Sequence, residues 1–252
     1  MLSEKLIHFY QSLRPPKNLP KGIGILFPQK DPQVIELIKK FFEKYFNDTK
    51  PRHLMFGINP GRYGAGITGV NFTAPRQLKE NCRIDHHLGL TSELSAEFIY
   101  DMISEYGGVK KFYQDWFIGS VCPLGFIKNG KNINYYDDKK LMEAVTSFIV
   151  DCINKQVAIG FNTDKCLCIG GEKNFKFLSG LLGRRSSGYG KNIAKGSRGA
   201  SDSRRGRKAS KKGDGSRISA IRAEEVEFKA REPTAPRLAH NGVGKTQCWG
   251  AR

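Results

Sequence analysis

The chain has 252 residues, of which 39% are hydrophobic, and its 42 Lys or Arg against 24 Asp or Glu give a formal net charge of +18. The apolar content is enough for a folded core, and no run approaches the ~18 apolar residues of a membrane-spanning helix. The positive charge favours an anionic partner, with nucleic acid the first choice. The six cysteines include no Cys-x-x-Cys pair, which predicts a reducing cytoplasm rather than a disulfide framework.

The periodicity predicts alternating helices and strands up to about Leu182. We expect helices over residues 3–13, 31–45, 95–106, 138–154 and 172–178, and buried strands over 53–58, 116–122 and 166–169. Asp31 followed by Pro32 is typical of a helix N-terminus. Residues 59–90 are rich in Gly, Pro and Asn, and a loop of that length inside a domain is usually functional.

Beyond Leu182 the apolar pattern stops and basic residues dominate. Residues 183–252 hold 18 Lys or Arg and 6 Asp or Glu, a net +12 in 70 residues. Such a segment buries too little surface to offset its ordering entropy. We therefore predict a globular domain over 1–182 and a basic low-complexity tail over 183–252, either disordered or aberrant.

The predicted strands and helices indicate an α/β fold, a three-layer α-β-α arrangement with a mainly parallel central sheet. Sites in such folds lie at the carboxyl ends of the strands. The candidate loops therefore open at Asn59, Pro123 and Gly170.

Residues 64–69 match Gly-x-Gly-x-x-Gly, the pattern of a dinucleotide-binding loop. The preceding strand ends too early, no helix opening follows, and Gly89 stands where an acidic residue is required. No P-loop, His-Glu-x-x-His or paired Cys-x-x-Cys motif occurs. We therefore expect neither a metal nor a cofactor.

Two segments carry a more specific signal. Residues 57–64 read GINPGRYG and 68–72 read TGVNF, and residues 120–124 read SVCPL. These resemble the first two motifs of uracil-DNA glycosylases, in particular the single-strand-selective monofunctional (SMUG) subfamily and its bacterial SMUG2-like branch. The resemblance covers roughly residues 50–180 and implies the three-layer fold of that family.

The resemblance implies a pocket for a flipped base. Asn59 would position the hydrolytic water, Phe72 would stack on the base, and Tyr63 would line the mouth of the pocket. Ile58 and Gly61 would supply backbone groups near the base. From position alone, Asn59 also fits an Asx-turn before proline, and Phe72 also fits a core aromatic.

Ser120 stands where the SMUG pattern has Asn. An amide can donate to and accept from the edge of uracil together, whereas a hydroxyl reaches that edge through one group only. Xanthine and hypoxanthine therefore enter the substrate range beside uracil. The alternative is that Ser120 is a satisfied hydroxyl in a buried strand.

The family also carries a late His-Pro-x-x-Arg or His-Pro-Arg motif, whose histidine donates to the leaving base. Residues 179–239 contain no histidine, so His240, which no proline follows, is the remaining candidate. The tail is then either a natural extension or, as we hypothesise, an out-of-frame or otherwise aberrant C-terminus. Resequencing the source DNA tests this, because an uninterrupted frame with no alternative frame encoding the motif would contradict it.

The basic tail is also a candidate phosphate-binding segment. Its basic cluster comprises Arg204, Arg205, Arg207 and Lys208. Such a cluster would add salt-sensitive affinity for DNA, and the alternative is a solvated run of charges.

Three functions follow from these features. The first is a monofunctional glycosylase of base excision repair, which removes uracil or another deaminated base from single- or double-stranded DNA. It would act as a monomer in the bacterial cytoplasm or nucleoid, without metal, cofactor or membrane. The second is a nucleic-acid binder that has lost catalysis, and the third is a nucleotide-binding α/β protein that uses the glycine-rich loop.

Overall fold

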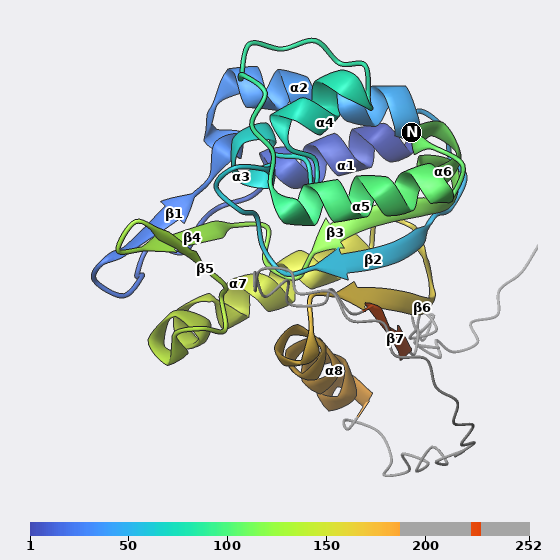
Figure 1. Ribbon diagram of the computed structural model, residues 1–252. Coiled ribbons are helices and arrows are strands. Elements are labelled where there is room, and N and C mark those ends of the chain that lie inside the picture. The colour runs from blue at the N-terminus through green and yellow to red at the C-terminus, as the bar shows by residue number, and fades with distance from the viewer. Residues whose placement is uncertain (187–222, 228–252) are drawn as a thin grey trace, which may run out of the picture.

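The computed structural model describes residues 1–186 and 223–227, with the helices and strands drawn in Figure 1. The helices are α1 (Leu2–Gln11), the 3-10 helix η1 (Pro28–Lys30), α2 (Pro32–Phe46), α3 (Ala65–Thr68), α4 (Pro75–Glu80), α5 (Leu94–Glu105), α6 (Val109–Asp115), α7 (Lys139–Val157) and α8 (Glu172–Ser186). The strands are β1 (Ile23–Leu26), β2 (His53–Gly57), β3 (Trp116–Ser120), β4 (Gly125–Lys128), β5 (Lys131–Ile133), β6 (Asn162–Ile169) and β7 (Ala223–Glu227).

The central sheet has the strand order β3-β2-β6-β7. β2 pairs in parallel with β3 and with β6, and β7 joins the far edge antiparallel to β6. Figure 1 shows α1, α2, α4, α5 and α6 over one face of this sheet, with α7 and α8 over the other. This confirms the predicted three-layer α/β fold with a mainly parallel sheet.

A second, antiparallel sheet of order β1-β4-β5, which was not predicted from the sequence, lies beside the central one. β4 and β5 form a hairpin whose turn contains Asn129 and Gly130, both with positive φ. These short strands carry few alternating apolar residues, so periodicity gave little sign of them. The hairpin brings residues 131–135 back toward the end of β2, where they contact Asn59.

The helices predicted to begin at residues 31 and 138 are confirmed, and in the structure each has an aspartate at its N-cap. Asp31 accepts a hydrogen bond from Gln33 N at 2.9 Å, and Asp138 accepts one from Leu141 N at 3.0 Å. Each carboxylate satisfies a donor that the first turn leaves unpaired. The helix predicted over 172–178 is longer in the structure, where α8 extends to Ser186.

Aromatic side chains dominate the layer between the central sheet and α1, α2 and α6. Phe42 stacks on Tyr10 at 5.5 Å between ring centroids, and Phe46 meets Phe117 edge to face at 5.8 Å. Phe117 in turn stacks on Phe161 at 4.7 Å. Because buried aromatic rings bring large apolar areas and favour these offset or edge-on geometries, this cluster holds α1 and α2 against β3.

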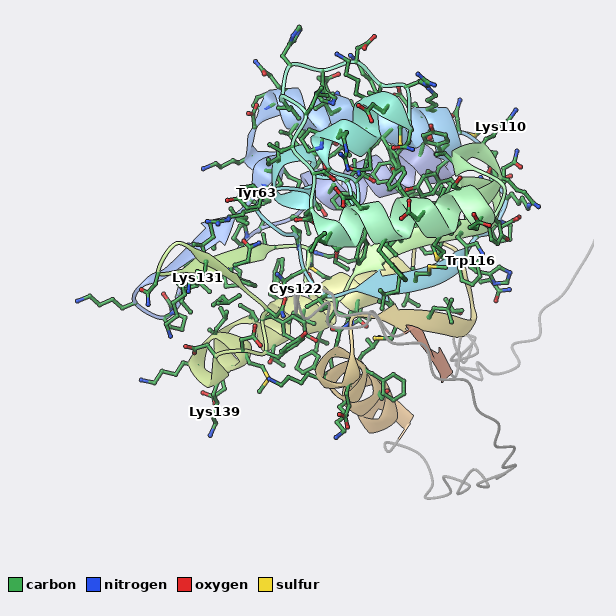
Figure 2. The ribbon with its side chains drawn as sticks, in the orientation of Figure 1. Tyr63, Lys110, Trp116, Cys122, Lys131 and Lys139 are labelled. Carbon is green, nitrogen blue, oxygen red and sulfur yellow. The ribbon has the colours of Figure 1, made fainter. Side chains whose placement is uncertain are left out.

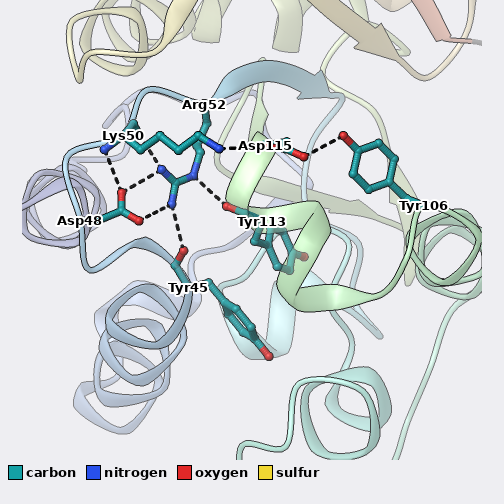
Figure 3. Close-up of polar contacts among 7 residues, drawn as sticks. All are labelled: Tyr45, Asp48, Lys50, Arg52, Tyr106, Tyr113 and Asp115. Carbon is teal, nitrogen blue, oxygen red and sulfur yellow. Dashed lines mark hydrogen bonds and ion pairs between the residues drawn. The ribbon is translucent and has the colours of Figure 1, made fainter.

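Arg52 fixes the start of β2, and its guanidinium is fully buried. It donates to both carboxylate oxygens of Asp48 at 2.8 Å and to the Tyr113 carbonyl at 2.8 Å, as Figure 3 shows. Further bonds go to the carbonyls of Lys50 at 2.5 Å and Tyr45 at 3.4 Å. A buried cation needs such partners, and here they join the ends of α2 and α6 to the strand that leads to the site.

The expectation that residues 59–90 form one long loop is wrong in part, because α3 and α4 lie within it. Each is too short to show helical periodicity, and Pro75 at the first turn of α4 is a start signal that the loop prediction overlooked. Among the described residues no helix is long and apolar enough to cross a membrane.

Candidate active site

The candidate site lies where β2 and β3 end side by side. Gly57 is paired with Ser120, and the ladder continues beyond the strands, since Cys122 N donates to the Ile58 carbonyl at 3.0 Å. The predicted loops at Asn59 and Pro123 therefore leave the sheet next to each other. The two segments that carry the sequence motifs meet at this carboxyl edge.

Asn59 follows β2 by two residues and is partly exposed. Its side-chain oxygen accepts a hydrogen bond from Tyr135 N at 3.1 Å, and its Nδ2 lies 3.4 Å from the Ile133 carbonyl. These two contacts fix the orientation of the Asn59 amide, with its oxygen toward Tyr135 N and its nitrogen toward the Ile133 carbonyl. Among the described residues no second donor reaches this oxygen, so its other lone pair can accept from a further donor such as a water molecule.

A chain of buried hydrogen bonds supports the backbone segment that contacts Asn59. Tyr135 is fully buried, and its hydroxyl donates to Asn174 Oδ1 at 2.7 Å. Asn174 lies in the first turn of α8, and its Nδ2 donates to the Ile169 carbonyl at 3.0 Å. The backbone that holds Asn59 is therefore tied to the end of β6 and the start of α8.

Phe72 lies against the end of β2 in a strained conformation, with φ of +52°. Its ring covers Gly57 so closely that a Cβ built there would lie 2.9 Å from Phe72 Cζ and nearer still to Cε2. Buried Thr68 and Thr73 hold the turn, since the Thr68 hydroxyl donates to the Thr73 carbonyl at 2.6 Å. The ring is thus fixed over the backbone where β2 ends.

Ser120 is buried, and its hydroxyl proton, peptide nitrogen and carbonyl are all hydrogen-bonded. Its hydroxyl donates to Asn71 Oδ1 at 2.6 Å. Gln156 of α7 clamps its peptide, accepting from Ser120 N at 3.3 Å and donating to Ser120 O at 2.9 Å. Because β3 is the edge strand, this amide supplies the pairing that a neighbouring strand would give.

Gly61 and Gly64 make room for a carboxylate. A Cβ on Gly61 would lie 2.5 Å from Glu93 Oε2, and one on Gly64 would meet the other oxygen of the same group. Burial raises the pKa of Glu93, and the Ser95 hydroxyl, which donates to it at 3.1 Å, opposes that effect. Gly61 and Gly64 are thus packed against the Glu93 side chain, and residues 65–68 between Gly64 and Gly69 form only the single turn α3.

Tyr63 stays 48% exposed at the rim. The Arg62 guanidinium lies 4.5 Å from its ring centroid and donates to the Gly130 carbonyl of the β4–β5 turn. Figure 2 places Tyr63 and Lys131 on the side of the molecule where β1, β4 and β5 lie, with Cys122 nearer the centre. A stacked cation and aromatic ring, with an exposed lysine on the same hairpin, form a basic rim beside the site.

The structure brings together Phe72 and Ser120, through Gly57 and Asn71, and puts Asn59 on the same strand end. Tyr63 lies at the rim, and the Ile58 carbonyl already accepts a bond from Cys122. His240 and the four basic tail residues, Arg204, Arg205, Arg207 and Lys208, lie outside the described residues. Their predicted roles stay predictions.

Four polar residues of this site were not singled out from the sequence: Asn71, Tyr135, Gln156 and Asn174. Each is buried and polar, and burial is what makes a polar side chain informative. Asn71 lies in the TGVNF segment, so the motif could have identified it as a candidate site residue. The other three lie in segments with ordinary helical or loop patterns. Among the described residues no cluster of three His, Cys, Asp or Glu could hold a metal.

Comparison with known proteins supports the resemblance seen in the motifs. Residues 43–218 match the family model of the uracil DNA glycosylase superfamily. The wild-type crystal structure of SMUG2 from Pedobacter heparinus is 43% identical, with a TM-score of 0.69, and the match covers 73% of this chain and 81% of that one. A search of curated proteins gave no match. The chain therefore belongs to the uracil DNA glycosylase superfamily, as its motifs and the meeting of β2 and β3 at one edge indicated.

Proposed function

We propose that the chain is a monofunctional DNA glycosylase that hydrolyses the N-glycosidic bond of uracil or another deaminated base. The observation that carries this proposal is the placement of Asn59, Phe72 and Ser120 around the joint end of β2 and β3. DNA is the partner, and base excision repair in the bacterial cytoplasm is the process. The superfamily match and the likeness to SMUG2 support the reaction class.

Asn59 is suited to hold the attacking water. Cleavage gives the sugar oxocarbenium character and leaves an anionic base, so the water must approach C1′ from the face opposite the base. The Asn59 oxygen has one lone pair engaged by Tyr135 N and one left to accept from that water. A neutral amide orients the water, and its fixed geometry avoids reorganisation during the reaction.

The Phe72 ring supplies a stacking face for a base taken out of the helix. Stacking of this kind contributes about 1–3 kcal/mol per base in single-strand binders. The strained φ of Phe72 and its packing on Gly57 pre-position the ring, so little ordering is needed when DNA binds. Arg62 and Lys131 at the rim are suited to phosphate contacts.

A DNA-binding relative without catalysis is the second candidate. The observation that favours it is the absence of histidine from residues 179–239, where the family motif is expected. Such a protein would bind DNA with affinity that falls steeply with salt and would excise nothing.

Excision from a uracil-containing single-stranded oligonucleotide separates the two candidates. The abasic product is cleaved by alkali, and wild type is compared with Asn59→Ala. We expect strand cleavage only after alkali treatment and loss of at least about 100-fold of the rate in the variant, a typical worth for one positioned catalytic group. Salt-dependent binding by a folded wild-type protein that releases no base would favour the second candidate.

A further inference from the structure

The hydrogen bonds around Ser120 determine which of its atoms can reach a base. The side-chain nitrogen of Asn71 lies 3.0 Å from the Ile118 carbonyl. A carbonyl oxygen can only accept, so the atom facing it must be the amide nitrogen. The opposite end of the Asn71 amide, facing Ser120, is therefore its oxygen.

The orientation of Asn71 determines the direction of its hydrogen bond with Ser120. Asn71 Oδ1 can only accept, and it lies 2.6 Å from Ser120 Oγ, so the Ser120 hydroxyl must donate its single proton to it. The second amide hydrogen of Asn71 goes to the Tyr10 hydroxyl at 3.0 Å, so the nitrogen has no proton to spare. Ser120 is left with lone pairs alone.

Ser120 also faces the side of the sheet where the base would stack. It is paired with Gly57 in the parallel ladder, and paired residues present their side chains to the same face. The Cβ direction of Gly57 points at the Phe72 ring. Ser120 Oγ, Asn71 and Phe72 therefore share one face at the end of β2 and β3.

We propose that Asn71 is a specificity-determining positioning residue, which makes Ser120 a pure acceptor and so selects bases that carry a hydrogen on the ring nitrogen of their pairing edge. Uracil, hypoxanthine and xanthine carry that N–H, whereas cytosine and adenine present a lone pair there. A lone pair against the committed Ser120 oxygen leaves both groups unpaired. This inference rests on the proposed function and adds the rule by which the site distinguishes uracil from cytosine and hypoxanthine from adenine.

Binding of a non-cleaved base tests the rule apart from catalysis. The probes are single-stranded oligonucleotides with one 2′-fluoroarabino-uridine or one 2′-fluoroarabino-cytidine, because a fluorine next to C1′ disfavours the oxocarbenium state and slows hydrolysis. The measured quantity is the ratio of the two dissociation constants. For wild type we expect uracil to bind about 10- to 100-fold more tightly, the range for one good contact to a base edge.

Two variants should each reduce the preference for the uridine probe, but through different probes. Asn71→Ala frees the Ser120 proton, so affinity for the cytidine probe should rise and the ratio should fall about tenfold. Ser120→Ala removes the acceptor, so affinity for the uridine probe should fall and the ratio should shrink by a similar factor. Tyr10→Phe is the matched control, because the Ile118 carbonyl still orients Asn71, and the wild-type ratio should be kept.

The inference is overturned if Asn71→Ala and Ser120→Ala fold and keep the wild-type ratio, or if wild type binds both probes equally while still excising uracil. Where Asn71→Ala fails to fold, Ser120→Ala alone decides, since a wild-type ratio there is enough to reject the rule. A wild-type protein that neither binds the uridine probe nor excises uracil contradicts the proposed function itself.

Discussion

Replacing Gly57 by alanine should disturb the fold and the site together. The added Cβ would lie 2.9 Å from Phe72 Cζ and closer to Cε2, well inside ordinary van der Waals distance. The ring cannot retreat easily, because its residue has a φ of +52° in a turn held by the Thr68 and Thr73 hydroxyls. Overpacking of this kind costs about 1–3 kcal/mol of unfolding free energy.

The measurement is urea denaturation followed by far-UV circular dichroism, with the free energy of unfolding compared between variants. Gly24→Ala is the matched control, since it is also a strand glycine and a Cβ there would lie 3.8 Å from the nearest atom. We expect Gly24→Ala to change stability by less than about 1 kcal/mol. Equal stability of Gly57→Ala and wild type would refute the claim that Phe72 is fixed on β2.

Three further predictions concern the Arg52–Asp48 ion pair and two buried cysteines. Arg52→Met should lower the free energy of unfolding by about 2–4 kcal/mol in urea denaturation, because it orphans the carbonyls that the guanidinium joins, and an unchanged value would show that this network is dispensable. The hydrogen bonds from Arg52 hold the pKa of Asp48 below its usual value, so the stability that this carboxylate adds is present at neutral pH and is lost as the pH falls below about 4. The stability difference between wild type and Asp48→Asn should therefore shrink between pH 7 and pH 3, and a difference that grows on acidification would contradict the sign. Burial raises the pKa of Cys82 to about 11 and of Cys122 to about 12, so peptide mapping after alkylation at pH 8 should find both unmodified in native protein and modified in urea.

Most of the central architecture could be predicted from local pattern. The apolar runs predicted as strands at 53–58 and 116–122 and the helix start at Asp31 and Pro32 are signals within a few residues, and they led to the right strands and helix. The short α3 and α4 and the β1-β4-β5 sheet could not be predicted in this way. Tertiary contacts stabilise them, and their own sequences carry little periodicity.

Some residues of the candidate site could likewise be predicted from the sequence, and others could not. Asn59, Phe72 and Ser120 were accessible because they belong to motifs read along the chain. Their partners act across the fold, as with Gln156, which is 36 residues from Ser120, and Tyr135, which is 76 residues from Asn59. A single sequence does not state which distant amide will pair with which strand end, so the hydrogen-bond directions at Ser120 needed the structure.

The release of free uracil under single-turnover conditions tests whether the chain is a glycosylase whose Asn59 positions the water. Mass spectrometry would follow the free base from a uracil-containing single strand, with wild type, Asn59→Ala and Asn47→Ala, an exposed asparagine at the end of α2, as the matched control. We expect base release by wild type and Asn47→Ala, and a rate lower by at least about 100-fold for Asn59→Ala. Equal rates for the three proteins would contradict the assignment of Asn59, and no release by a folded wild-type protein would contradict the proposed function.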